Sequence, residues 1–362
     1  MNDNKNLTIQ ETFNLAVKNH QEGKTDIAQN FYNQVLKIDP NHSAALNNLG
    51  IIFKDLGENQ KAKDCYEKAI EIEPNYADAH NNLGVLFKDL GEQQKAIGFY
   101  EKTIEIDSGY ADAHYNLGVL FKDLGEHQKA KDCYEKAIEI NPSYADAHFN
   151  LGALFKDLGE HQKAKECYKK AIEIEPNYAD AYNNLGEIYK ILEEYQKAKE
   201  CYKKAITIKP DHLDAHNNLG VIFYELGENQ KAKDCYEKVI EINPNHADVH
   251  FNLGLMFKKL KDYQKAIDSY EKAIEINPNH ADAHNNLGVI FKNLGENKKA
   301  IDCYKEAASA YKKALDLDPL NEQKLLAYGA AMIKLNEHKK GLEYIKKGTG
   351  VIEFTPENYK II

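Results

Sequence analysis

Asparagine recurs at one fixed place in this chain, once every 34 residues. A carboxamide carries one acceptor oxygen and two N–H donors, so it can hydrogen-bond both the N–H and the C=O of a peptide backbone, whatever side chains that peptide has. Asparagine is about 0.5 kcal/mol less favourable than alanine inside a helix, so helix propensity does not explain the column. We predict that the column binds peptides; the alternative is that each carboxamide bonds to a neighbouring helix. Its members are Asn48, Asn82, Asn116, Asn150, Asn184, Asn218, Asn252 and Asn286.

An aspartate column lies four residues before the asparagines. One interpretation makes it an acidic surface for basic partners. In the other, the Asn of Pro-Asn-Tyr-Ala-Asp caps a helix, and the Asp at the third helical position completes a capping pair and offsets the helix dipole, worth about 0.3–1 kcal/mol. We favour capping, although the two roles are compatible. The aspartates are Asp78, Asp112, Asp146, Asp180, Asp214, Asp248 and Asp282.

Cysteine and histidine also recur, and their spacing decides whether they could bind metal. The six cysteines fall at one place in the period and never as C-x-x-C, so we expect reduced, partly buried thiols. His-x-Asp-x-His at 212–216, 246–250 and 280–284 has the i, i+4 spacing of a zinc site. Other periods carry tyrosine in place of the first histidine, which favours packing. We expect no catalytic, cofactor-binding or metal-binding residue, since the sequence also has no nucleophile elbow, phosphate loop or catalytic carboxylate pair.

These columns belong to a 34-residue unit that is clearest in residues 111–144. With Ala111 as position 1, positions 7, 8 and 11 have the spacing of one helix face, and positions 20, 24, 27 and 28 have that of a second. Gly125 is placed to end the first helix in a left-handed conformation, and Pro142 stops the second. The unit is predicted to form a first helix over about 111–124, a turn, and a second helix over about 127–140. One hairpin cannot bury both apolar faces, so neighbouring hairpins must stack.

The residue types at these positions resemble the tetratricopeptide repeat: Leu at 7, Gly at 8, an aromatic at 11, Ala at 20, Tyr at 24, Ala at 27 and Pro at 32. The resemblance covers most of the chain. It implies an all-α solenoid, a right-handed superhelix of stacked helix-turn-helix hairpins, whose first helices line a concave groove that binds peptides of other proteins. The chain is similar in particular to the repeat arrays of O-linked GlcNAc transferases, in which such an asparagine ladder holds extended substrate chains.

The array is expected to span residues 9–349 in nine to ten repeats. The ninth repeat has seven extra residues, almost two helical turns, which predict a longer second helix and not a loop. The tail, 350–362, is expected either to form a short helix over 356–362 that caps the open end, or to stay an apolar segment that docks on a partner or another copy. The repeat bounds are 9–42, 43–76, 77–110, 111–144, 145–178, 179–212, 213–246, 247–280, 281–321 and 322–349.

The totals argue against several classes of protein. The 362-residue chain has a net charge of −10 and no arginine, the residue that reads phosphates and base edges in bidentate fashion. We therefore expect no nucleic-acid binding. No apolar run reaches the roughly 20 residues of a membrane span, and the polar N-terminus lacks the centre of a secretion signal, so we expect no membrane insertion and a cytoplasmic location. The expected partner is a protein or peptide segment.

Two functions fit this reading. The first is a non-enzymatic scaffold that binds an extended or flexible segment of a partner through the asparagine ladder. The alternative is a substrate-targeting arm related to O-GlcNAc-type glycosyltransferases without the catalytic domain, since the chain ends about a dozen residues after its last repeat. The clamp by which some tetratricopeptide repeats hold C-terminal carboxylates is not expected, because positions 2 and 9 carry Asp and mostly Val where the clamp needs Lys and Asn.

Overall fold

The computed structural model describes residues 8–349, 352–354 and 359–361. Within these residues the chain forms twenty α-helices followed by two short strands. It divides into two compact units, unit 1 at residues 1–181 and unit 2 at residues 182–362. Each unit is described by itself, and helix α11 (Ala179–Ile191) crosses the boundary between them.

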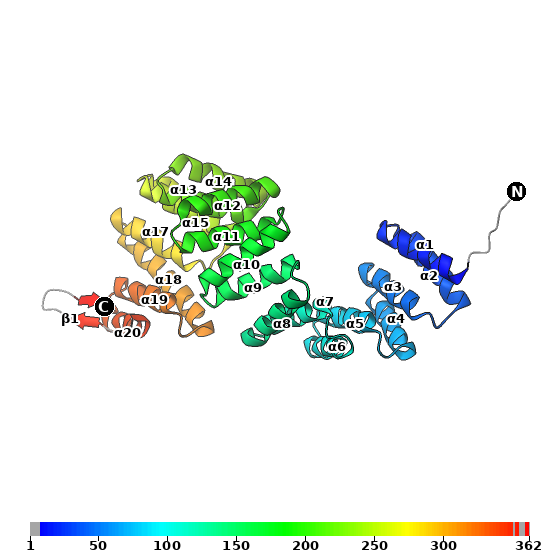
Figure 1. The fold of residues 1–362 in the computed structure, drawn as a ribbon. Coiled ribbons are helices and arrows are strands. Elements are labelled where there is room, and N and C mark those ends of the chain that lie inside the picture. The colour runs from blue at the N-terminus through cyan, green and yellow to red at the C-terminus, as the bar shows by residue number, and fades with distance from the viewer. Residues whose placement is uncertain (1–7, 350–351, 355–358, 362) are drawn as a thin grey trace. The chain divides into compact units, whose positions relative to one another are not determined.

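Both units are built from helix pairs joined by short turns (Figure 1). The helices of unit 1 are α1 Ile9–Gln21, α2 Thr25–Ile38, α3 Ser43–Asp55, α4 Asn59–Ile72, α5 Ala77–Asp89, α6 Gln93–Ile106, α7 Ala111–Asp123, α8 His127–Ile140, α9 Ala145–Asp157 and α10 His161–Ile174. Those that follow α11 in unit 2 are α12 Tyr195–Ile208, α13 Leu213–Glu225, α14 Asn229–Ile242, α15 Ala247–Lys259, α16 Tyr263–Ile276, α17 Ala281–Asn293, α18 Asn297–Leu317, α19 Glu322–Lys334 and α20 His338–Thr349.

The predicted hairpin of residues 111–144 is confirmed to within a residue at each end, as α7 and α8. Gly125 has φ +74° and ends α7. Its N–H bonds the carbonyl of Lys122 at 3.0 Å, and the N–H of Glu126 bonds that of Phe121 at 2.8 Å, which together make a Schellman motif. The same turn position has positive φ without glycine at Glu193, Lys261 and Asn336. The turn geometry is therefore imposed by the packing of the hairpin as well as by the residue.

From the second repeat to the ninth, each hairpin closes around one contact between a glycine of the first helix and a tyrosine ring of the second. A Cβ added to Gly84 would lie 2.7 Å from Cε1 of Tyr100, and one added to Gly118 would lie 2.8 Å from the Tyr134 ring. The tyrosines of this column, from Tyr32 to Tyr270, are fully buried or nearly so. Ala at position 20, such as Ala130, is buried beside them. The absence of a Cβ lets the two helices approach closely enough for the ring to fill the gap.

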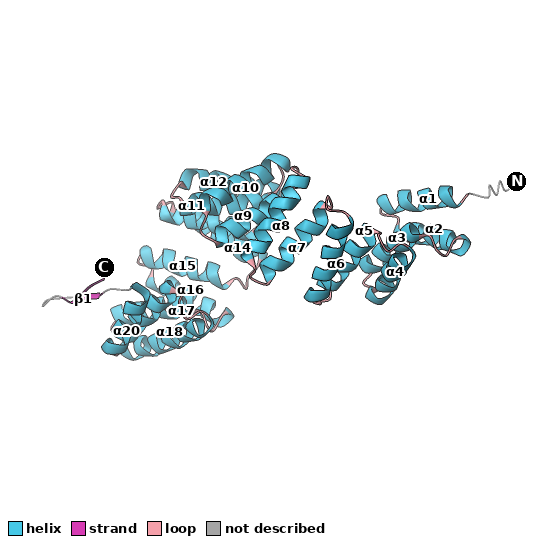
Figure 2. Cartoon of the chain, turned by 60° about the horizontal axis from the view of Figure 1, so that its bottom comes forward, coloured by secondary structure: helices cyan, strands magenta, loops and turns pink. Residues whose placement is uncertain are grey.

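Successive hairpins stack within each unit, with each second helix packed on the next first helix (Figure 2). First helices also contact the first helices of the next hairpin: α3 with α5, α5 with α7 and α7 with α9 in unit 1, and α13 with α15 in unit 2. The first helices from α3 to α9 in unit 1, and α13 with α15 in unit 2, therefore form continuous surfaces.

The longer second helix predicted in the ninth repeat is confirmed as α18, which has 21 residues where its counterparts have 14. Its first half packs Ala300 and Tyr304 against α17. Its second half buries Tyr311 and Leu315 against α19. The seven extra residues thus continue one apolar face, as almost two whole helical turns require.

The tail differs from the prediction of a capping helix over 356–362. Residues Ile352–Phe354 (β1) pair antiparallel with Tyr359–Ile361 (β2), with Ile352 opposite Ile361. The helix prediction is therefore wrong for 359–361, while residues 355–358 and 362 lie outside the described part. Val351, Ile352, Phe354, Tyr359, Ile361 and Ile362 are residue types that favour strands, and the helix prediction overlooked this feature of the sequence.

The glycine–tyrosine contact predicts opposite results for two glycines of neighbouring helices. Gly84→Ala places a methyl group against Tyr100, and we expect it to destabilise the chain by about 1–3 kcal/mol. Gly98→Ala, on the exposed side of α6, meets nothing within 4 Å and should stabilise by up to about 1 kcal/mol. Chemical denaturation of the two variants measures both effects, and equal effects would contradict the packing argument.

Candidate functional site

The surface formed by the first helices carries the predicted asparagine column, and we call it the first-helix face. It comprises the side chains at repeat positions 2, 5, 6, 9, 12 and 13 of these helices, for example Asn116 and Lys122 of α7. All eight predicted asparagines lie on it, four in unit 1 and four in unit 2. Asn218 is buried and the other seven are half-buried, so the column lies at the edge of the packed interior.

In unit 1 each asparagine of the column donates its Nδ2 to the preceding repeat. The acceptor is a side-chain oxygen in every case. The bonds are Asn48 to Tyr32 Oη at 3.2 Å, Asn82 to Asn47 Oδ1 at 2.9 Å, Asn116 to Asn81 Oδ1 at 3.5 Å and Asn150 to Tyr115 Oη at 2.7 Å. These bonds tie consecutive hairpins together.

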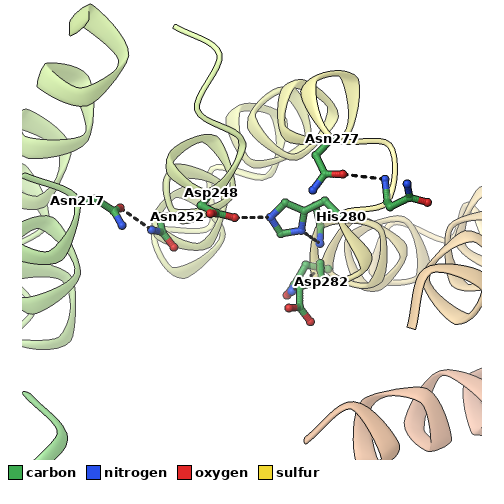
Figure 3. A network of polar contacts seen from close by, with 9 residues as sticks. Asn217, Asp248, Asn252, Asn277, His280 and Asp282 are labelled. Atoms are coloured by element: carbon green, nitrogen blue, oxygen red, sulfur yellow. Dashed lines mark hydrogen bonds and ion pairs between the residues drawn. The ribbon is translucent and has the colours of Figure 1, made fainter. Parts of the chain in front are cut away.

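The pattern continues in unit 2. Asn218 donates to Asn183 Oδ1 at 3.1 Å, and Asn252 donates to Asn217 Oδ1 at 2.9 Å (Figure 3). Asn184 accepts from Asn183 Nδ2 at 3.3 Å. The last member departs from the pattern because phenylalanine, Phe251, stands where its acceptor would be. Asn286 donates instead to the backbone carbonyl of Asp282 at 2.9 Å and accepts from Lys258 at 2.7 Å.

Most of these carboxamides therefore use one N–H for a hydrogen bond to a neighbouring helix, as the alternative interpretation expects. The acceptor oxygens are used less. Among the described residues, no hydrogen bond reaches Oδ1 of Asn82, Asn116, Asn150, Asn218 or Asn252. Peptide binding by the column stays a prediction, and it now concerns mainly the carbonyl oxygens.

Position 5, which supplies the acceptors, was not among the predicted site residues. It holds Asn47, Asn81, Tyr115, Asn183 and Asn217 where the bonds form, and phenylalanine at Phe149 and Phe251. The sequence carries part of this signal, because in these five cases an asparagine or tyrosine at position 5 precedes an asparagine at position 6 of the next repeat. Phe149 and Phe251 also precede an asparagine, so the pattern alone does not identify the bonded pairs.

Aspartates of the column join a first helix to the N-cap residue of the next first helix. Tyr110 donates its hydroxyl to Asp78 Oδ1 at 2.7 Å, and Tyr178 donates to Asp146 at 2.7 Å. His280 Nε2 lies 3.4 Å from Asp248 Oδ1 (Figure 3), and this contact lowers the pKa of Asp248. The aspartates are therefore held mainly by the side chain at position 34.

The predicted helix cap needs a correction. The N-cap residue is position 34, as in Tyr110 before α7, and not the asparagine at position 33. Asp112 is thus the second helical residue and forms no capping pair. At three of the four histidines in position 34, His42, His212 and His280, Nδ1 accepts from the backbone N–H three residues on, at 3.3 Å in His280, whereas His246 makes no such bond. Tyrosine lacks such an acceptor in the right place, which explains the difference.

The histidines of His-x-Asp-x-His have separate structural partners. His280 caps α17 and contacts Asp248, while His284 Nε2 lies 3.1 Å from the carbonyl oxygen of Pro278. The second contact recurs at His80, where the distance to Pro74 is 2.9 Å. Within the described part of the chain, no three His, Cys, Asp or Glu side chains are grouped as metal ligands.

Cys167, Cys235 and Cys303 line cavities between successive second helices. One of about 510 Å³ is lined by Cys303 together with Ile274, His284, Leu287 and other residues. Another of about 420 Å³ contains Cys167. All six thiols are half-buried and free, as predicted. Burial raises their pKa, to about 11 at Cys133 and about 12 at Cys167.

Models of known protein families match most of the chain. Models described as tetratricopeptide repeat or TPR repeat match residues 13–42, 31–64, 52–91, 86–125, 111–144, 145–178, 177–245, 247–280 and 269–302. The chain belongs to the tetratricopeptide repeat family. Its hairpins are tetratricopeptide repeats, and such arrays are protein-interaction scaffolds. Comparison with curated proteins gives no match.

Solved structures with similar folds each correspond to about half of the array. The structure titled a functional characterisation of Pseudomonas aeruginosa pilF is 22% identical, covers 56% of this chain and 92% of its own, and has a TM-score of 0.51, which supports the fold. YrrB, titled a TPR protein with an unusual peptide-binding site, is 26% identical, covers 51% and 95%, and has a TM-score of 0.42. MamA is 33% identical, covers 46% and 97%, and has a TM-score of 0.40.

A search of the described residues for membrane-spanning helices finds none that is both long and apolar enough.

The aspartate–tyrosine bonds predict a difference between two equivalent tyrosines. Tyr110→Phe removes the hydroxyl that bonds Asp78, and we expect it to cost about 1–2 kcal/mol of stability, because a hydrogen bond to a charged group is lost. Tyr76→Phe is the matched control, since its repeat has Ala44 where Asp78 would be. Denaturation midpoints should fall for the first variant only; an equal fall in both would assign the effect to packing.

The thiol environment predicts slow chemical modification. Burial favours the neutral thiol, so at pH 8 a cysteine of pKa about 11, such as Cys133, is about one part in a thousand thiolate, against roughly a quarter for an ordinary cysteine. The folded chain should therefore react with an aromatic disulfide reagent about a hundredfold more slowly than the unfolded chain, and faster as the pH rises toward 11. Reaction at the rate of free cysteine would contradict this.

Proposed function

We propose that this tetratricopeptide array is a non-enzymatic scaffold that holds an extended segment of a partner protein along its first-helix face, through the asparagine column. The observation that carries the proposal is the row of carboxamide oxygens at Asn82, Asn116 and Asn150 in unit 1, and at Asn218 and Asn252 in unit 2. These oxygens have no hydrogen-bond donor among the described residues, while the same side chains are fixed by their own Nδ2.

Fixing the side chain matters for affinity. A free asparagine on a helix surface would lose rotamer freedom when a ligand binds, at a cost of about 0.5–1.5 kcal/mol for each side chain that is immobilised. Here the inter-repeat bond has already selected one orientation, as at Asn82, whose Nδ2 lies 2.9 Å from Asn47 Oδ1. The oxygen is then available to a backbone N–H of a guest without that cost.

The spacing of the column suits an extended guest. Packed helices lie about 8–10 Å apart, so consecutive carboxamides should be separated by about that distance. A chain in the polyproline II conformation rises about 3.1 Å per residue with three residues per turn, and it presents the same face every 9 Å or so. One backbone N–H in three would meet one asparagine oxygen. The guest would be recognised by its backbone, with broad tolerance of its side chains.

The expected affinity is modest. Each such hydrogen bond contributes about 0.5–1.5 kcal/mol net, and association itself costs several kcal/mol. A handful of asparagines therefore supports affinity in the micromolar range at best, unless partner side chains add contacts.

Replacing the three unit 1 asparagines tests the proposal. We expect the triple variant Asn82→Ala, Asn116→Ala, Asn150→Ala to bind peptides selected from a random unstructured library on the native chain at least tenfold more weakly, since three acceptors are lost. Fluorescence anisotropy with the selected peptides measures the change.

The control removes the inter-repeat bonds and leaves the column oxygens in place. Asn47→Ala, Asn81→Ala and Tyr115→Phe together delete the acceptors that hold the same three asparagines. Some stability should be lost, while binding by the folded fraction should change much less. If the control weakens binding as much as the triple variant does, the column serves only to join repeats.

The second function, a targeting arm related to O-GlcNAc-type glycosyltransferases, stays a prediction that rests on the resemblance of the repeats. It implies that the selected peptides would be glycosylated when a separate catalytic subunit is added with UDP-GlcNAc. Turnover by this chain alone would contradict both functions.

A further inference from the structure

Two lysines at position 12 of the first helix have a carboxylate partner in unit 1. Lys54 lies 3.2 Å from Asp89, and Lys122 lies 3.6 Å from Asp157. In both pairs the aspartate is at position 13 of the next repeat. The two pairs show that the packing of neighbouring first helices can bring the residue at position 13 within reach of the lysine.

The last three repeats of unit 2 keep the lysines and lose the acids. Position 12 is Lys258 in α15 and Lys292 in α17, but the residues that follow at position 13 of the next repeats are Asn293 and Lys334. Lys334 in α19 thus stands beside Lys292 where unit 1 has an aspartate. Lys259 adds a further positive charge at position 13 of α15. At position 13 of the last repeat, the charge is therefore positive where the paired residues of unit 1 are negative.

Two of these lysines are held in place by neutral groups. Lys258 donates to Asn286 Oδ1 at 2.7 Å, and Lys334 donates to Asn285 Oδ1 at 2.7 Å. Lys334 also lies 5.1 Å from the centre of the Tyr304 ring. Both lysines are half-buried, and Lys292 is exposed between them. Burial and the nearby charges of Lys258 and Lys292 lower the pKa of Lys334.

Nearby acids do not neutralise the cluster. Asp262 pairs with Lys265 at 2.9 Å and Glu296 pairs with Lys299, both within the first turn of the following second helix. Across the described residues, no carboxylate forms an ion pair with Lys258, Lys292 or Lys334. A concentration of unpaired positive charge is unusual in a chain whose net charge is −10.

We infer that Lys258, Lys292 and Lys334 form a binding site for the side-chain carboxylates of an acidic segment in a partner protein, a specificity that rests on the proposed scaffold function. A guest carboxylate would take the place that Asp89 and Asp157 take beside the lysines of unit 1. The lysine–aspartate pairs of unit 1 thus show the kind of ion pair that the guest carboxylate would form. A peptide is favoured over a nucleic acid because the remaining surface is acidic and lacks arginine, the bidentate reader of phosphate.

The test uses the full chain and a fluorescent peptide of Asp, Glu, Gly and Ser, with a peptide of Asn, Gln, Gly and Ser as the neutral counterpart. The acidic peptide should bind at low salt, the neutral one at least tenfold more weakly, and the difference should shrink as salt is raised. Lys334→Asp rebuilds the unit 1 pair beside Lys292 and should weaken binding at least tenfold. Lys292→Gln, at an exposed position, gives a second variant that leaves the packing intact and should weaken binding several-fold.

A gain of function provides the matched comparison in unit 1. Asp157→Lys removes the partner of Lys122 and creates two adjacent unpaired lysines, so it should raise affinity for the acidic peptide several-fold.

Two results would overturn the inference. One is equal binding of the acidic peptide by the native chain, Lys334→Asp and Lys292→Gln. The other is binding of inorganic polyphosphate or single-stranded RNA at these lysines while the acidic peptide fails to bind. Neither result would touch the proposed scaffold function, because the library-selected peptides depend on the asparagines and not on the lysines.

Discussion

The contact between a glycine and a tyrosine ring determines the geometry of the hairpins from which both units are built. At the repeat glycines from Gly50 to Gly288, an added Cβ would lie no more than 3.0 Å from the ring. The two helices of a hairpin therefore sit at one distance, with the ring filling the space between them. Because the distance recurs, each hairpin presents the same surface to the next, and the stacking repeats without adjustment. Columns of side chains on the first-helix face are a consequence of this regularity.

The same regularity explains why polar side chains have two roles here. An asparagine at position 6 lies where one hairpin meets the next, so one of its N–H groups completes the packing and its oxygen lies toward the surface. The bond from Asn252 to Asn217 and the contact between Asp248 and His280 illustrate this at one junction (Figure 3). The bond across the junction between repeats gives the side chain a defined orientation.

Much of this could be predicted from the sequence, because the period, Gly125 and the apolar spacing each point to one hairpin. The elongated α18 followed from counting helical turns. Other features depended on information that periodicity does not contain. The N-cap shifted from position 33 to 34 because a single residue decides it, and the predicted capping role of Asp112 was lost with it. The inter-repeat bonds of the asparagines need the partner residue at position 5, and a search for one column at a time does not find pairs. The tail lies outside the 34-residue period, so the period gives no support for the helix predicted over 356–362.

Departures from the repeat are where the surface acquires chemistry of its own. Lys334 stands where unit 1 has an aspartate, and it reverses the local charge while its ammonium group bonds Asn285. Loss of an acceptor at Phe251 redirects Asn286 toward Asp282 and Lys258. Unit 2 thus combines the repeated hairpin with local substitutions that make the charge of its first-helix face different from that of unit 1.

The central claim is that partners lie on the first-helix face and not on the opposite surface. Site-specific photo-crosslinking measures this directly. In one variant a photoreactive residue replaces Val119, which is at position 9 of its repeat. Glu187 is at the same position of another repeat and contacts Asn218 of the asparagine column. In the second variant the photoreactive residue replaces Glu135, on the exposed side of α8. Library-selected peptides should crosslink through position 119 and not through position 135. Crosslinks formed mainly at position 135 would contradict the account.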